Sequence, residues 1–131
     1  MTIVIRRGQP EDWPAIVDFN CKMARETEGI NLDTAKVTSG VQAVLADGQM
    51  GFYVIAEASN DETTTIAGAL MVTQEWSDWR NGLFWWIQSV YIRNEYRRQG
   101  IYRLLYSHVK ALAEEAGNVC GFRLYVEKEN Q

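Results

Sequence analysis

Residues 83–116, LFWWIQSVYIRNEYRRQGIYRLLYSHVKALAEEA, decide the expected fold because three different patterns follow one another in this stretch. Residues 83–92 are almost entirely apolar and aromatic, which is typical of a strand buried on both faces, with Trp85 and Trp86 on opposite sides. The polar segment 93–100 ends that strand. Helical spacing then appears in the apolar residues Ile101, Leu104, Leu105, Val109 and Leu112. The stretch therefore predicts a strand, a basic glycine-containing turn and a helix.

The junction of turn and helix has the chemistry of an anion site. A helix leaves its first N–H groups unpaired and carries a partial positive charge at that end. Gly100 allows close approach of a ligand, and three arginines add full charges: Arg97, Arg98 and Arg103. Hydrogen bonds to a charged group contribute about 1.5–3 kcal/mol each, more than the roughly 0.3–1 kcal/mol of the helix dipole. Phosphate or pyrophosphate is the natural ligand, although such arginines also serve packing and solubility alone.

The same residues carry a resemblance to a known family. The pattern Arg97-x-x-Gly100-x-Tyr102, after the strand residues 88–92, resembles the acetyl-CoA-binding motif of the GNAT superfamily of N-acetyltransferases. The family pattern is Gln/Arg-x-x-Gly-x-Gly/Ala, so Tyr102 departs from it and must turn its ring aside. The resemblance implies acetyl-CoA as co-substrate. Its pyrophosphate would be held by the loop residues Arg97, Arg98, Gln99, Gly100, Ile101, Tyr102 and Arg103.

Composition limits the function classes. The chain of 131 residues has a net charge of -4, so we expect one domain, residues 1–131, and no nucleic-acid surface. Cys21 and Cys120 are too few for a disulfide framework or a metal site, and we expect buried, reduced thiols. No signal peptide and no run of about 18 apolar residues is present, which favours a cytoplasmic protein without a membrane anchor. A small or cationic partner suits this charge.

The remaining elements complete the expected fold. We expect strands at residues 2–7, 52–58, 65–74 and 120–127, helices at about 10–29 and 33–48, and a hairpin loop at 75–82 that contains Asn-Gly. Asp33 is the expected N-cap of the second helix, and Trp13 is expected on the inner face of the first. The order β-α-α-β-β-β-α-β is that of the acetyltransferase family. It predicts an α/β fold with a mixed, mostly antiparallel central sheet flanked by helices.

The family resemblance also implies where the cofactor arm lies. In that fold the fourth and fifth strands splay apart, and the pantetheine arm occupies the gap as though it were another strand. The main chain of Val90, Tyr91 and Ile92 would then hold the arm. Asn130 matches an asparagine that contacts the cofactor at the start of the family's next helix. The family's later tyrosine and its last two strands have no counterpart before Gln131, so we expect an incomplete domain with an open sheet edge that favours a homodimer.

Aminolysis of a thioester needs a neutral amine, a hydrogen-bond donor to the carbonyl oxygen and an acid that protonates the departing thiolate. Family members often place a glutamate on the fourth strand as the base, where this chain has Gln88. Gln88 cannot remove a proton, but it can order a water or simply bond within the sheet. The other candidates are the acids of the first helix and the hairpin: Glu26, Glu28, Glu75 and Asp78.

Each of these acids alone is better explained as solvated surface. As a set at one opening they would attract a cationic amine. Trp76, Trp79 and Trp85 could line that opening, although core packing is the default expectation for Trp85. We therefore expect acetyl transfer to a primary amine of a small cation by direct attack in a ternary complex. The alternatives are a non-catalytic acetyl-CoA-binding or interaction module and a phosphate-binding regulatory domain. His108 lies at the apolar spacing of the last helix and is expected to be structural.

Overall fold

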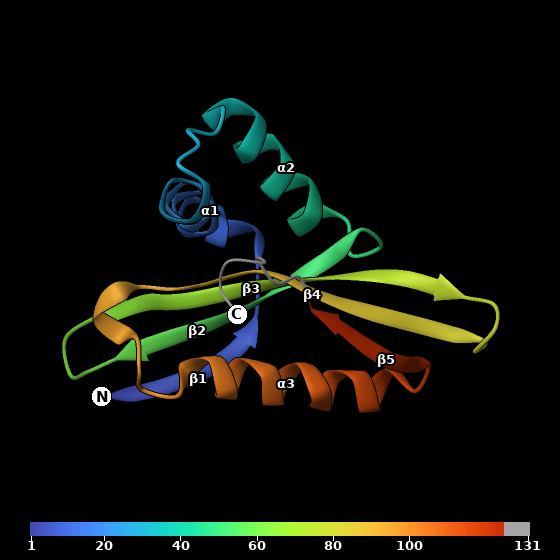
Figure 1. The fold of residues 1–131 in the computed structure, drawn as a ribbon. Helices are drawn as coiled ribbons and strands as arrows, with labels where there is room; N and C mark the ends of the chain where they lie inside the picture. The colour runs from blue at the N-terminus through green and yellow to red at the C-terminus, as the bar shows by residue number, and fades with distance from the viewer. Residues whose placement is uncertain (125–131) are drawn as a thin grey trace.

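The computed structural model describes residues 1–124, which form a five-stranded sheet with helices on both faces (Figure 1). The strands are β1 (Thr2–Arg7), β2 (Gly51–Ser59), β3 (Thr64–Ser77), β4 (Gly82–Ile92) and β5 (Val119–Leu124). The helices are α1 (Trp13–Glu28), α2 (Thr34–Ala46) and α3 (Ile101–Ala116), with 3-10 turns at Pro10–Asp12 and Asn94–Tyr96. This order of strands and α-helices confirms the expected fold class.

The sheet follows chain order, β1-β2-β3-β4-β5. The first four strands are antiparallel, whereas β4 and β5 are parallel. β5 pairs with β4 only from Leu83 to Ile87, and β4 then continues beside β3 as far as Ile92. Within residues 1–124, no strand pairs with the other edge of β4 beyond Ile87. The expected continuation of the last strand to residue 127 lies outside the described residues, so the splay of β4 and β5 stays a prediction.

Two apolar layers sandwich the sheet, because successive side chains of a strand point to opposite faces. Ile55 of β2 packs with Phe19 beneath α1 and α2. Its neighbour Val54 packs with Leu105 beneath α3. Figure 1 shows α1 and α2 above the sheet and α3 below it. Asp33 caps α2, as predicted, by accepting hydrogen bonds from two backbone N–H groups.

Three apolar residues are less buried than the sequence suggested. Trp13 is 37% exposed because it lies in the first turn of α1, beside the C-terminal end of α2. Leu104 is 43% exposed, since the buried stripe of α3 is made by Ile101, Leu105, Val109 and Ala113. Trp86 is half-buried, because the β3–β4 hairpin extends beyond α1 and α2 (Figure 1). β4 is therefore buried on both faces only in part.

The hairpin also differs from the expectation in length. β3 continues to Ser77, so Glu75 and Trp76 belong to a strand and the connecting loop is residues 78–81. Asn81 has a φ of 50°, the left-handed conformation that made Asn-Gly a turn signal. The cysteines are free but only half-buried. None of the described helices is long and apolar enough to cross a bilayer.

Candidate active site

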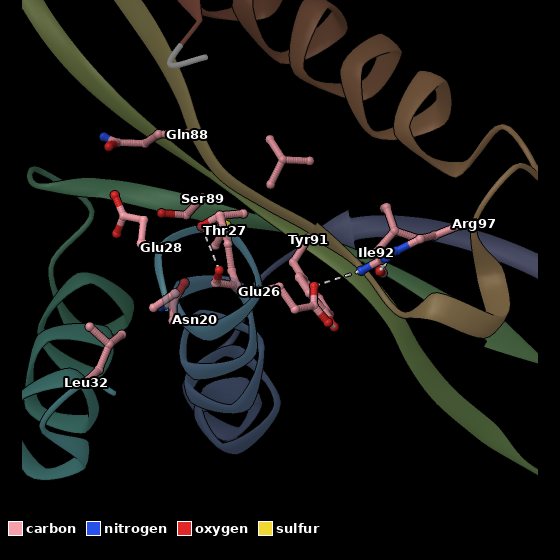
Figure 2. A pocket seen from close by; sticks show the side chains of 13 residues that line it. Asn20, Glu26, Thr27, Glu28, Leu32, Gln88, Ser89, Tyr91, Ile92 and Arg97 are labelled. Carbon is pink, nitrogen blue, oxygen red and sulfur yellow. Dashed lines mark hydrogen bonds and ion pairs between the residues drawn. The ribbon is translucent and has the colours of Figure 1, made fainter. Parts of the chain in front are cut away.

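A cavity of about 680 Å³ lies between the second half of β4 and the end of α1 (Figure 2). Its volume is in the range of small-molecule sites. The lining residues come from α1, β4 and the segments that follow them: Asn20, Met23, Ala24, Glu26, Thr27, Glu28, Leu32, Gln88, Ser89, Val90, Tyr91, Ile92 and Arg97. The cavity therefore adjoins the part of β4 that follows its described pairing with β5.

A β-bulge shapes this wall of the cavity. Met71 pairs with Gln88 but Ala69 pairs with Tyr91, so one extra residue is inserted in β4. Ser89 takes up the distortion with a φ of 54°. Bulges bend a strand and leave one residue out of the ladder. The main chain of β4 is therefore irregular where it forms the wall of the cavity.

The bulge also decides which face Tyr91 occupies. Trp85 and Ile87 pack beneath α3, and strict alternation would send residue 91 to the same face. The extra residue reverses the alternation, so Tyr91 packs with Phe19 beneath α1 instead. The sequence pattern indicated a role only for the main chain of Tyr91 and gave no role to its side chain. The run of apolar residues carries no signal that a bulge interrupts it.

Glu26 is the meeting point of three elements. Tyr91 Oη donates to Glu26 Oε1 at 3.3 Å, and Arg97 Nη2 donates to Glu26 Oε2 at the same distance (Figure 2). Arg97 Nε donates to the carbonyl of Ile92 at 2.9 Å, and its guanidinium lies 5.3 Å from the centre of the Tyr91 ring. Burial of Tyr91 raises the pKa of its hydroxyl, and the Glu26 carboxylate raises that pKa further. The last turn of α1 is thereby tied to the end of β4.

Gln88 lines the same cavity but has a partner within the sheet. Its Nε2 donates a hydrogen bond of 2.8 Å to Thr73 Oγ1 on β3. This is the structural role that the sequence left open beside water ordering. Glu28 also lines the cavity, from the last turn of α1.

The two hairpin acids lie apart from this cavity. Glu75 Oε1 accepts a hydrogen bond of 2.6 Å from Trp86 Nε1 and lies 3.6 Å from Arg123 Nε. Asp78 belongs to the connecting loop, where its carbonyl accepts from the N–H of Asn81. The structure therefore brings Glu26, Glu28 and Gln88 together, without Glu75 and Asp78.

The three candidate tryptophans are also separated. Trp79 is 96% exposed and Trp76 is 58% exposed on the hairpin. Trp85 is a core residue, packed edge-to-face on Phe52 with ring centres 5.3 Å apart. None of the three lines the cavity. The indoles therefore do not mark its opening.

The loop before α3 presents an exposed main chain. Gly100 is the N-cap of α3 with a φ of 78°, and a Cβ there would meet nothing within 4 Å. Tyr102 stacks on Tyr106 with an angle of 17° between the rings, so it is turned along the helix, as the departure from the family pattern required. Arg98, Gln99 and Arg103 are exposed, whereas Ile101 is buried in the core. The loop is open to an anion.

Two further sequence expectations are not part of this site. Asn130 lies outside the described residues. His108 is half-buried on α3, away from the cavity lining. Residues 1–124 contain no group of three or more His, Cys, Asp or Glu side chains placed to hold a metal ion.

The fold and site together define a mixed α/β protein with a cavity between the second half of a central strand and the end of a helix. The sequence model of the Acetyltransferase (GNAT) family matches residues 13–131. The chain therefore belongs to the GNAT family of acetyltransferases. A comparison with curated proteins found no match.

Solved structures agree with this assignment. A possible acetyltransferase from Clostridium difficile 630 is 45% identical, with a TM-score of 0.87 over 99% of this chain and 83% of that one. A predicted acetyltransferase from Clostridium acetobutylicum, solved with acetyl-CoA, is 20% identical, with a TM-score of 0.76 over 99% and 84%. An aminoglycoside acetyltransferase from an uncultured soil metagenomic sample, in complex with sisomicin, is 15% identical, with a TM-score of 0.75 over 98% and 80%. The last two share the fold.

Proposed function

We propose that the chain transfers the acetyl group of acetyl-CoA to a primary amine of a small cationic acceptor, by direct attack in a ternary complex. The observation that carries this proposal is the cavity between residues 88–92 of β4 and the acid-bearing end of α1. One wall offers the bulged main chain of β4. The other wall offers the carboxylates of Glu26 and Glu28.

The thioester side of the reaction uses the β4 wall and the loop before α3. The main chain of Val90, Tyr91 and Ile92 would hold the pantetheine arm, and residues 97–103 would bind the pyrophosphate. The exposed N-cap at Gly100 supports this placement. The Clostridium acetobutylicum relative with acetyl-CoA supports the choice of co-substrate.

The amine side uses the acids of α1. A primary alkyl amine has a pKa near 10.4, as in lysine, so at pH 7 it is an ammonium that must lose a proton before it attacks. Glu26 would accept that proton, directly or through a water, and Glu28 would help to attract the cation. The amine nitrogen then bonds to the acetyl carbon and gives up a second proton, the carbon–sulfur bond breaks, and the departing thiolate takes up a proton. The aminoglycoside acetyltransferase with sisomicin supports an amine-bearing acceptor.

Two experiments test this function. Calorimetry with CoA establishes whether the folded chain binds the co-substrate. A thiol-release assay with acetyl-CoA then compares polyamines, aminoglycosides, amino acids and lysine peptides. We expect turnover with cationic amines and the highest kcat/KM for one of them. A preference for an anionic acceptor would contradict the role given to the α1 acids.

A second candidate is a non-catalytic acetyl-CoA-binding or interaction module. The observation that favours it is that the candidate catalytic side chains already have protein partners. Glu26 is bonded by Arg97 and Tyr91, and Gln88 is bonded to Thr73. CoA binding without turnover across the whole amine panel would favour this candidate. A cytoplasmic location also remains an expectation from the sequence, which cell fractionation would test.

A further inference from the structure

Arg97 occupies an unexpected position between the two halves of the site. The motif assigns it to the pyrophosphate of acetyl-CoA, yet its guanidinium is directed toward the last turn of α1. Its Nη2 lies 3.3 Å from Glu26 Oε2 in an ion pair, and its Nε bonds the carbonyl of Ile92 (Figure 2). Glu26 is the acid that the proposed function assigns to the acceptor amine. The ion pair therefore joins Arg97, which is assigned to the cofactor, to Glu26, which is assigned to the acceptor amine.

We propose that the Glu26–Arg97 ion pair couples the two substrates, because each of them must draw one partner away from the other. Pyrophosphate bound by Arg97 takes the cation from Glu26, and an ammonium bound by Glu26 takes the carboxylate from Arg97. The first ligand to bind breaks the pair, so the second binds without that cost. Acetyl-CoA thereby releases Glu26 for the acceptor and for proton removal. This inference rests on the proposed function.

The exposure of the two side chains sets the size of the coupling. Arg97 is 42% and Glu26 is 50% exposed, so both can reorient in water without burying a charge. Exposed ion pairs are weak enough to exchange readily, and their strength corresponds to a coupling of about two- to fivefold in affinity. By linkage, each ligand must change the affinity for the other by the same factor. Tyr91 Oη donates its hydrogen bond to the other oxygen, Oε1, of Glu26. This bond is separate from the ion pair with Arg97 that the substrates are expected to break.

Calorimetry with CoA tests the coupling from the cofactor side, since CoA carries the pyrophosphate but no acetyl group to transfer. We expect Glu26→Gln to bind CoA two- to fivefold more tightly than the wild type, because Arg97 is then free. Glu28→Gln is the matched control. It removes the same charge from the same helical turn and cavity, but Glu28 has no bond to Arg97 within residues 1–124. In an Arg97→Gln background, the additional Glu26→Gln change should no longer tighten CoA binding.

The outcomes separate the inference from the proposed function. Equal CoA affinities of Glu26→Gln and Glu28→Gln would overturn the coupling, and so would a Glu26→Gln effect that persists without Arg97. No CoA binding by the folded wild type, with folding checked by circular dichroism, would overturn the proposed function and the coupling with it. The acceptor side supplies a second arm. KM for the best amine of the panel should fall two- to fivefold as acetyl-CoA approaches saturation, and this fall should vanish in Arg97→Gln.

Discussion

The hydroxyl of Tyr91 donates a 3.3 Å hydrogen bond to Oε1 of Glu26, and this contact joins β4 to the last turn of α1. Tyr91 is 6% exposed, and its ring lies 5.2 Å from that of Phe19. Tyr91→Phe keeps the ring and removes the hydrogen bond, so we expect a loss of about 1 kcal/mol in the free energy of unfolding. Tyr91→Ala also removes a buried ring and should cost about 3–5 kcal/mol. Urea denaturation measures both. Equal losses would show that the ring contributes little.

Gly100 allows the pyrophosphate site to be tested with a change of charge alone. Asn and Asp are the residues other than glycine that best tolerate its left-handed backbone, and a side chain there meets open space. Gly100→Asp places a carboxylate where a phosphate should bind, so we expect CoA affinity to fall at least about tenfold, the equivalent of one lost charge-assisted hydrogen bond. Gly100→Asn is the uncharged control and should change the affinity less than about threefold. Equal affinities of the two variants would place the pyrophosphate elsewhere.

The two groups of acids give contrasting predictions for catalysis. Removal of a general base lowers rates by about 10²–10⁴-fold, so Glu26→Gln should lose at least about 10²-fold in kcat/KM for the best amine. Glu75→Gln and Asp78→Asn should stay within about threefold, because neither residue lines the cavity. Steady-state kinetics over the amine panel separates the groups. The hairpin acids remain candidates until then, and a hundredfold loss in Glu75→Gln would establish a base on β3.

Asp12 should contribute stability that depends on pH. It is 5% exposed, and both of its carboxylate oxygens accept bonds from Arg6, at 2.7 and 2.8 Å. Burial by itself raises the pKa of Asp12, but the bonds from Arg6 and from the Gln9 N–H, together with the Arg6 charge, lower it overall. The contribution is therefore complete above the unfolded pKa of about 3.9, and it is lost as the pH falls through the lower folded value.

Asp12→Asn tests this linkage. We expect it to cost about 1.5–3 kcal/mol near pH 6, the range for hydrogen bonds to charged groups. The difference from the wild type should shrink below about pH 4. Urea titrations at several pH values give the profile. Glu11→Gln is the control, because Glu11 is exposed and has no side-chain bond in the described residues. Its difference in unfolding free energy from the wild type should not vary with pH in this way. A cost for Asp12→Asn that does not vary with pH would contradict the linkage.

The homodimer expected from the sequence stays a prediction, and the outer edge of β5 is the surface on which it would form. Among residues 1–124, β5 pairs with β4 on one side and with no strand on the other. Open edges present unpaired N–H and C=O groups that pair readily with another chain. We therefore expect light scattering to give a mass near twice 15.0 kDa. A monomer at all concentrations would contradict a dimer built on this edge.

Much of the fold was predictable because local patterns act over short distances. The apolar run of β4, the spacing of α3, the cap at Asp33 and the turn at Asn81 each depend on neighbouring residues. The motif around Gly100 likewise indicated an exposed loop, which the structure contains, whereas anion binding by this loop stays a prediction. The length of β3 was underestimated, since the polar residues at its end also suit a loop. Pairing with β4 keeps Glu75 in the strand.

The sequence by itself determined the family, the order of elements and the residues of the loop before α3, because these depend on residue types at fixed spacings. Only the tertiary structure decided which acids share the cavity and where Tyr91 points. The bulge at Ser89 reverses the alternation of β4, and it arises from how β4 pairs with β3. Glu26 and Tyr91 are 65 residues apart in the chain. They meet because α1 packs on the sheet face to which the bulge directs Tyr91. No local sequence pattern predicts the register shift between β3 and β4 that produces the bulge.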